Sequence, residues 1–120
     1  MSQGSSPHLH YRTDYKGVTV VGFNSPYLQA EADIEKVGAD LLDLVENKGL
    51  TKLVLTFQGV RFVSSSMLAQ VVKLHKAVAK AGGKLRVCSL APALLEVVQK
   101  SHLDKLLDVV PDEAAAMTKF

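Results

Sequence analysis

Apolar residues recur along this chain with two different spacings, which predict strands and helices in turn. The run Leu53 to Phe57 is apolar and of strand length, which suits a strand buried on both faces of a parallel sheet. The segment Val18 to Phe23 is rich in β-branched residues and predicts the second strand of a hairpin. Residues 30–47 and 65–81 instead place apolar residues three and four positions apart, which is the pattern of one buried helix face. Strands and helices are therefore expected to alternate.

Shorter patterns complete the series. The further expected elements are an edge strand at 9–15, a strand at 85–89, a helix beginning at Pro92, a strand at 106–110 and a helix capped by Asp112 and running through Met117. The resulting order β-β-α-β-α-β-α-β-α implies right-handed crossovers between parallel strands. We expect one α/β domain at residues 8–120, with a mixed, largely parallel sheet, an N-terminal antiparallel hairpin and about four helices. The small polar residues 1–7 are expected to form a flexible leader.

Three consecutive serines, Ser64, Ser65 and Ser66, fall where the strand ending at Phe57 is followed by a helix. Gly59, between strand and serines, can adopt a positive φ. Serines at such a junction commonly cap the helix by accepting hydrogen bonds from its unpaired N–H groups. The helix dipole also favours negative charge there, so a serine that is not the cap could carry a phosphate. We expect Ser64 to be the cap, Ser65 to be poorly presented and Ser66 to expose its oxygen.

Two other loops are expected beside the serines. Asn24-Ser25-Pro26 and Leu90-Ala91-Pro92 also follow predicted strands. Open α/β sheets place their sites where parallel strands end, so all three loops should line one edge of the sheet. The serines could also serve for capping alone.

Hydrolysis by a nucleophilic serine is the competing chemical hypothesis. A hydrolase elbow needs the pattern Gly-x-Ser-x-Gly, and this loop has no flanking glycines. His75 lies on the apolar face of the predicted helix, where a packed core histidine is expected rather than a base. No catalytic residue is predicted.

Composition and charge argue against several other classes of function. The chain has 120 residues, a net charge of +2 and a single cysteine, Cys88, so neither a nucleic-acid binder nor an internal disulfide is indicated. No metal site is predicted, and the phosphate-loop spacing is absent around Gly82-Gly83-Lys84. No apolar run reaches the length of a membrane span, and a cytoplasmic protein is expected. Lys73, Lys76 and Lys80 form a basic stripe that suits solvent or an acidic partner.

Three segments together resemble the STAS domain, in particular the stand-alone anti-sigma factor antagonists of bacteria. They are Gly59-Val60-x-Phe62-x-Ser64-Ser65-Ser66-x-Leu68, then Gly82-Gly83-Lys84-Leu85-Arg86-Val87, then Leu103-Asp104-Lys105-Leu106, and the resemblance covers residues 8–117. The family loop typically reads Asp-Ser-Ser/Thr-Gly-Leu, and its second hydroxyl residue is phosphorylated by a partner kinase. Ser64 and Met67 stand at the Asp and Gly positions.

The resemblance implies an anti-sigma factor antagonist that binds an anti-sigma factor with serine kinase activity while unphosphorylated. Ser66 is the implied acceptor, with Ser65 and Ser64 as alternatives, and a serine phosphatase would reset the switch. ATP and magnesium would belong to the kinase, so no cofactor is expected for this chain. The expected partner-binding residues are Asn24, Ser25, Arg61, Phe62, Ser64, Ser65, Met67, Leu90, Ala91 and Pro92.

The alternative is a constitutive STAS scaffold or adaptor in a larger signalling or transporter-associated complex, without a phosphate cycle. The uncharged Ser64 and the bulky Met67 favour this alternative.

Overall fold

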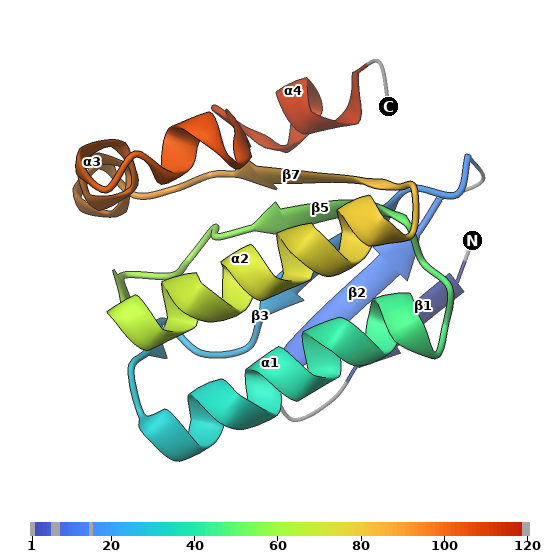
Figure 1. The fold of residues 1–120 in the computed structure, drawn as a ribbon, viewed down its shortest axis with the longest axis horizontal. Helices are drawn as coiled ribbons and strands as arrows, with labels where there is room; N and C mark the ends of the chain where they lie inside the picture. Colours follow the sequence, from blue (N-terminus) through green and yellow to red (C-terminus); the bar gives the residue numbers. More distant parts are fainter. Residues whose placement is uncertain (1, 6–7, 15, 119–120) are drawn as a thin grey trace.

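The computed structural model describes residues 2–5, 8–14 and 16–118, and of residues 2–5 the backbone alone. The described residues form a six-stranded sheet in the order β1-β2-β3-β5-β7-β8 (Figure 1). Strands β1 to β3 are antiparallel neighbours, and β3, β5, β7 and β8 are parallel. The strands are β1 (Ser2–Ser5), β2 (Leu9–Thr13), β3 (Thr19–Phe23), β5 (Lys52–Thr56), β7 (Lys84–Cys88) and β8 (Asp108–Val110). The predicted single α/β domain with a mixed, largely parallel sheet is thus confirmed.

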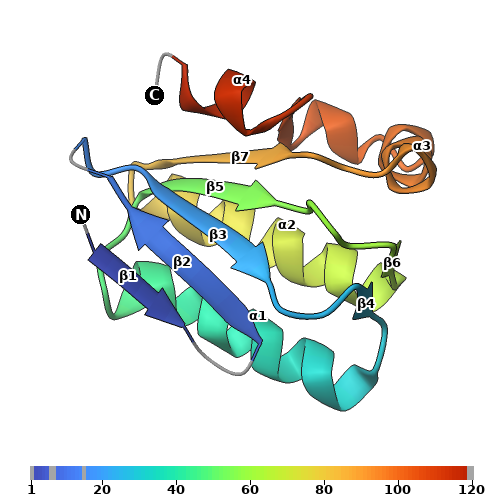
Figure 2. The same cartoon turned by 180° about the vertical axis from the view of Figure 1, so that it is seen from behind.

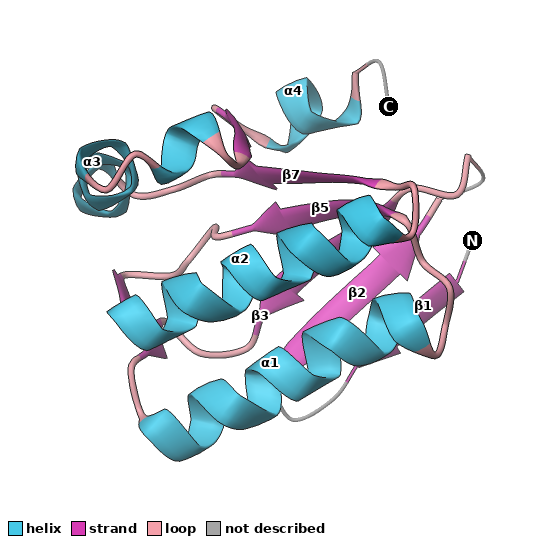
Figure 3. Cartoon of the chain, in the orientation of Figure 1, coloured by secondary structure: helices cyan, strands magenta, loops and turns pink. Residues whose placement is uncertain are grey.

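The helices lie on both sides of this sheet. Figures 1 and 3 show α1 and α2 side by side across one face, whereas α4 packs on β5, β7 and β8 on the other face. Helix α3 lies beyond the end of β7 (Figure 1). The helices are α1 (Glu31–Glu46), α2 (Ser65–Lys80), α3 (Pro92–Lys100) and α4 (Glu113–Met117), with a 3-10 turn at Leu103–Lys105. None of these helices is both long and apolar enough to cross a membrane, within the residues described.

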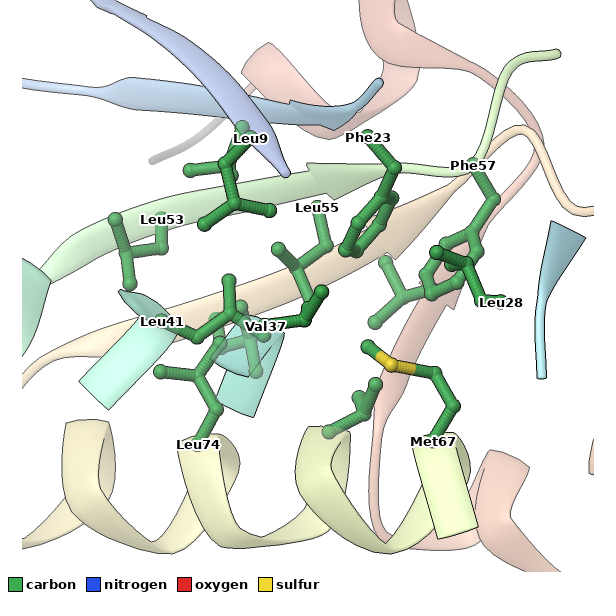
Figure 4. Packing of buried hydrophobic residues seen from close by; sticks show 14 of the residues in the cluster. Leu9, Phe23, Leu28, Val37, Leu41, Leu53, Leu55, Phe57, Met67 and Leu74 are labelled. Carbon is green, nitrogen blue, oxygen red and sulfur yellow. The ribbon is translucent and has the colours of Figure 1, made fainter. Parts of the chain in front are cut away.

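The main core lies between the sheet and helices α1 and α2. In Figure 4, Leu53 and Leu55 of β5 face the same cluster as Leu41 of α1 and Leu74 of α2. Val54, between those two leucines, belongs to the smaller cluster on the opposite face. Side chains of a strand alternate between its two faces, so β5 is buried on both. This confirms the expectation for its continuous apolar run.

The predicted boundaries hold to within two residues for most elements. The helices expected at 30–47 and 65–81 are Glu31–Glu46 and Ser65–Lys80. The strand expected at 106–110 begins only at Asp108, because the chain turns just before it and Leu107 N–H donates a hydrogen bond of 2.7 Å to Leu103 O. The strand expected at 9–15 ends at Thr13, where the Asp14 carboxylate accepts hydrogen bonds from the N–H groups of Lys16 and Val18. Residue 15 lies outside the described residues.

Part of the expected leader, residues 2–5, takes part in the sheet. Ser2–Ser5 form β1 and pair antiparallel with β2, so β2 is an inner strand rather than the edge. Strand pairing uses backbone N–H and C=O groups, which any such sequence possesses, and therefore it leaves little trace in the apolar pattern. Residues 1, 6 and 7 of the expected leader lie outside the described residues.

Candidate functional site

Backbone hydrogen bonds join the serine loop to the loop that follows β3. The N–H groups of Arg61 and Phe62 both donate to Pro26 O, at 2.7 and 3.2 Å, and Ser64 N–H donates to Leu28 O at 2.9 Å. A short parallel pair, β4 (Tyr27–Leu28) with β6 (Phe62–Val63), results. Figure 2 shows this pair beyond the ends of β3 and β5. The two loops predicted to share a sheet edge are therefore in direct contact.

The turn that leads into this region is set by a glycine. Gly59 adopts a φ of 83°, a conformation that L-residues with a side chain rarely adopt. Just before it, Phe57 N–H donates to Cys88 O at 3.0 Å, which fastens the end of β5 to the end of β7. The chain therefore leaves the sheet at a fixed point before it reaches the serines.

The three serines have different surroundings. Ser64 has extended backbone angles and its hydroxyl accepts a hydrogen bond from Met67 N–H at 3.2 Å, so it is the N-cap of α2, as predicted. Ser65 is exposed, and its hydroxyl has no hydrogen-bond partner among the described residues. Ser66 is half-buried, and its hydroxyl donates to Glu31 Oε1 at 2.8 Å.

The expected order of exposure of Ser65 and Ser66 is therefore reversed, although the bond from the Ser66 hydroxyl to Glu31 is itself solvent-exposed. Ser65, not Ser66, is the most exposed serine of the loop. The cause is α1, whose first residue, Glu31, comes from outside the serine segment and contacts the Ser66 hydroxyl.

Met67, expected to contact a partner, is not a surface residue in this structure. Its side chain is fully buried and packs in the main core, where Figure 4 shows it near Leu28 and Phe57. Residue 67 lies on the face of α2 that also carries Val71, Leu74 and Val78, and that whole face is turned inward. The bulk that this side chain has relative to glycine is thus accommodated in the core and not beside Ser66.

The exposed surface next to the serines carries two aromatic side chains. Phe62 is 47% exposed and Tyr27, which pairs with it across β4 and β6, is 53% exposed. Arg61, Asn24 and Ser25 are also exposed. Tyr27 was missed from the sequence, because its two-residue strand has no periodicity. The available signal was an aromatic residue directly after the Ser25-Pro26 break.

The third predicted loop follows β7 and lies at the same edge of the sheet (Figure 1). Leu90 and Ala91 are half-buried and pack against the core, while Pro92 is exposed at the start of α3. Of this loop, Pro92 is therefore the most accessible residue.

The histidine, the cysteine and the metal-ligating side chains that the structure describes do not lie together at the serines. His75 was expected to pack in the core, but it is only half-buried. It lies nine positions after Ser66 along α2, which corresponds to a rise of roughly 13 Å. Cys88 is buried, and its desolvation raises the pKa of its thiol, which disfavours the reactive thiolate. Among the described residues, no three His, Cys, Asp or Glu side chains are placed to hold a metal ion.

The hydrogen bond that Ser64 makes as N-cap of α2 is expected to stabilise the protein. We expect Ser64→Ala to lower the free energy of unfolding by about 0.5–2 kcal/mol, because Met67 N–H loses its acceptor. Ser65→Ala is the matched control and should change it by less than about 0.5 kcal/mol. Urea denaturation followed by circular dichroism measures both. Equal effects at the two positions would contradict the assignment of the cap.

Comparison with known proteins gives one family. The family model of the STAS domain matches residues 13–116. Among curated proteins, an anti-sigma F factor antagonist of Paenibacillus polymyxa is 22% identical over 106 residues, which cover 88% of this chain and 89% of that protein.

Solved structures share the fold. An anti-sigma-factor antagonist (STAS) domain protein of Planctomyces limnophilus matches with a TM-score of 0.79 at 23% identity, covering 93% of this chain and 96% of that one. The phosphorylated form of the Bacillus cell fate determinant SpoIIAA matches with a TM-score of 0.68 at 17% identity, covering 89% and 95%. The murine anion transporter Slc26a9 matches with a TM-score of 0.67 at 21% identity, covering 83% of this chain but only 17% of the transporter.

Proposed function

The chain belongs to the STAS domain family, and we propose that it is an anti-sigma factor antagonist whose binding is switched by phosphorylation of Ser66. The observation that carries the proposal is the position of the Ser66 hydroxyl in the first turn of α2, beside an exposed surface. The names of the relatives support the general role, and the phosphorylated form of SpoIIAA supports a phosphate on a protein of this fold.

The N-terminal end of α2 favours a phosphate on Ser66, whereas the Glu31 carboxylate of α1 opposes one. The first turn of α2 contains no acidic residue, so the positive end of its dipole is not neutralised from within the helix. A phosphate there gains roughly 0.3–1 kcal/mol from the dipole. In a complex the same group would bring nearly two negative charges into an interface that contains Tyr27 and Phe62. Desolvating these charges would weaken binding.

The proposed partner is an anti-sigma factor that is also a serine kinase, and a serine phosphatase would reverse the modification. In the transfer, Ser66 Oγ attacks the γ-phosphorus of ATP, the bond from that phosphorus to the β-phosphate oxygen breaks to release ADP, and the hydroxyl proton passes to a basic group of the kinase or to solvent. The kinase supplies ATP, magnesium and the catalytic groups. This chain then acts as a binding module rather than as an enzyme, in the cytoplasm where such partners occur.

Labelling by the kinase tests the proposal. We expect incubation with the cognate anti-sigma kinase and ATP to add one phosphate, located on Ser66 by mass spectrometry, and Ser66→Ala to abolish it. Ser66→Ala should still bind the kinase, because it leaves the interface neutral. Phosphate on Ser65 or Ser64 would contradict the assignment to Ser66.

The second candidate is a constitutive scaffold or adaptor without a phosphate cycle. The likeness to a STAS-sized part of Slc26a9 and the uncharged Ser64 support it. Under this alternative, the kinase would label none of the three serines, and a charge at position 66 would leave partner binding unchanged.

A further inference from the structure

A hydrogen bond joins the N-terminal ends of the two long helices. Ser66 in the first turn of α2 donates from Oγ to Oε1 of Glu31, the first residue of α1, at 2.8 Å. The two residues are 35 positions apart in sequence, and both helices begin at the same edge of the sheet (Figure 1). The bond is solvent-exposed, so either partner can change without disturbing the core.

The end of α1 that carries Glu31 has no side-chain cap. Its cap residue is Ala30, which offers no side-chain hydrogen bond to the free N–H groups of the first turn. The turn is closed by the bond from Ile34 N–H to Ala30 O at 2.9 Å. Among the described residues, the Ser66 hydroxyl is the hydrogen-bond donor to the Glu31 carboxylate. A change at Ser66 therefore acts on a helix end that lacks a side-chain cap, although the buried Ile34 fixes the inner side of the same turn in the core.

Phosphorylation would reverse the sign of this contact. In a phosphoserine, Oγ is an ester oxygen and carries no proton, so it cannot donate to Glu31. The phosphate oxygens are acceptors and carry nearly two negative charges at neutral pH. The Glu31 carboxylate is also only an acceptor. An attraction thus becomes a repulsion between like charges, while the N–H groups of α2 retain the phosphate.

We propose that Glu31 reads the phosphorylation state of Ser66. When Ser66 is unphosphorylated, Glu31 holds the start of α1 against the serine loop. When Ser66 carries phosphate, the Glu31 side chain is repelled from the loop, and the first turn of α1 opens. The inference rests on the proposed function only in taking Ser66 as the modified residue. It adds a second consequence of the phosphate, a change in the shape of the α1 end of the interface.

Amide hydrogen exchange tests this directly. Phosphoserine can be installed at position 66 during translation by genetic-code expansion, so that no kinase or partner is needed. The reporter is the amide of Ile34, a buried residue whose N–H is released only when the first turn opens. We expect exchange of this amide, measured by NMR, to be about fivefold faster in the phosphoprotein.

Two variants separate the role of Glu31 from that of general charge. Glu31→Gln keeps an acceptor for the Ser66 hydroxyl and can donate to a phosphate, so the phosphate should change Ile34 exchange less than twofold. Asp33→Asn is the matched control, since it removes one charge from the same turn of α1 without touching Ser66. It should leave the fivefold effect intact.

Each outcome decides the proposal. Equal Ile34 exchange with and without phosphate would overturn it, as would an equal acceleration in Glu31→Gln and in the unsubstituted protein. Binding to the anti-sigma factor, measured separately on the same samples, tests the proposed function. Loss of the exchange effect with phosphate-sensitive binding intact would reject the role of Glu31 alone. The exchange effect without such binding would reject the proposed partner alone.

Discussion

Leu55→Ala is expected to lower the free energy of unfolding by about 2–5 kcal/mol. Leu55 is fully buried at the centre of β5, where it pairs with Val21 of β3 and with Val87 of β7. It belongs to the core between the sheet and helices α1 and α2 (Figure 4). Truncation removes apolar contacts on several sides at once, and strands fixed in a sheet cannot move together to fill the space. Urea denaturation followed by circular dichroism measures the loss.

Leu106→Ala is the matched control, because it deletes the same atoms from a leucine that is 43% exposed. Its expected effect is below about 1 kcal/mol, since nearly half of that residue is already exposed to water. A loss under about 1 kcal/mol for Leu55→Ala, or equal losses for the two variants, would contradict the central position of β5.

The fold was predictable where burial repeats along the chain. Helix α1 buries Ile34, Val37, Leu41 and Leu44, and this spacing stands in the sequence as a helical period. Strand β5 is buried on both faces, so it reads as a continuous apolar run. A strand buried on both faces needs helices on either side of its sheet. Periodicity therefore determined most of the architecture.

Elements that depend on backbone pairing alone were not predictable. Strand β1 at residues 2–5 consists of small polar residues, and the pair β4–β6 has only two residues in each strand. Neither has an apolar pattern of its own. Their strands form because a neighbouring backbone offers free N–H and C=O groups, as Pro26 O does for two N–H groups of the serine loop.

The sequence was enough to locate the loop that forms the candidate site, but not to place each of its side chains. Position in the chain sufficed to identify Ser64 as the cap, because a cap acts on residues that follow it directly. It did not suffice for Ser66, whose hydrogen-bond partner comes from α1. Met67 was misplaced for a related reason, since its inward direction depends on where the inner face of α2 begins.

Ser66→Asp is expected to weaken binding to the anti-sigma factor at least tenfold, which corresponds to about 1.4 kcal/mol. The substitution removes the hydroxyl that donates to Glu31 and places a second carboxylate against it. It also adds a charge that binding must desolvate beside Tyr27 and Phe62. One carboxylate carries less charge than a phosphate, so the weakening should be smaller than that caused by phosphoserine. Isothermal titration calorimetry with the purified partner measures it.

Ser66→Asn is the matched control, because asparagine has the size of aspartate but no charge, and its amide can donate to Glu31. Its affinity should stay within about threefold of the unsubstituted protein. Equal weakening by both variants would point to side-chain size instead of charge, and no weakening by either would favour the constitutive module.

The dependence of affinity on salt distinguishes the two electrostatic causes, which are repulsion from Glu31 and desolvation of the new charge. Repulsion between exposed carboxylates is screened, so added salt should recover part of the lost affinity, whereas the cost of desolvating the charge in the interface persists at high salt.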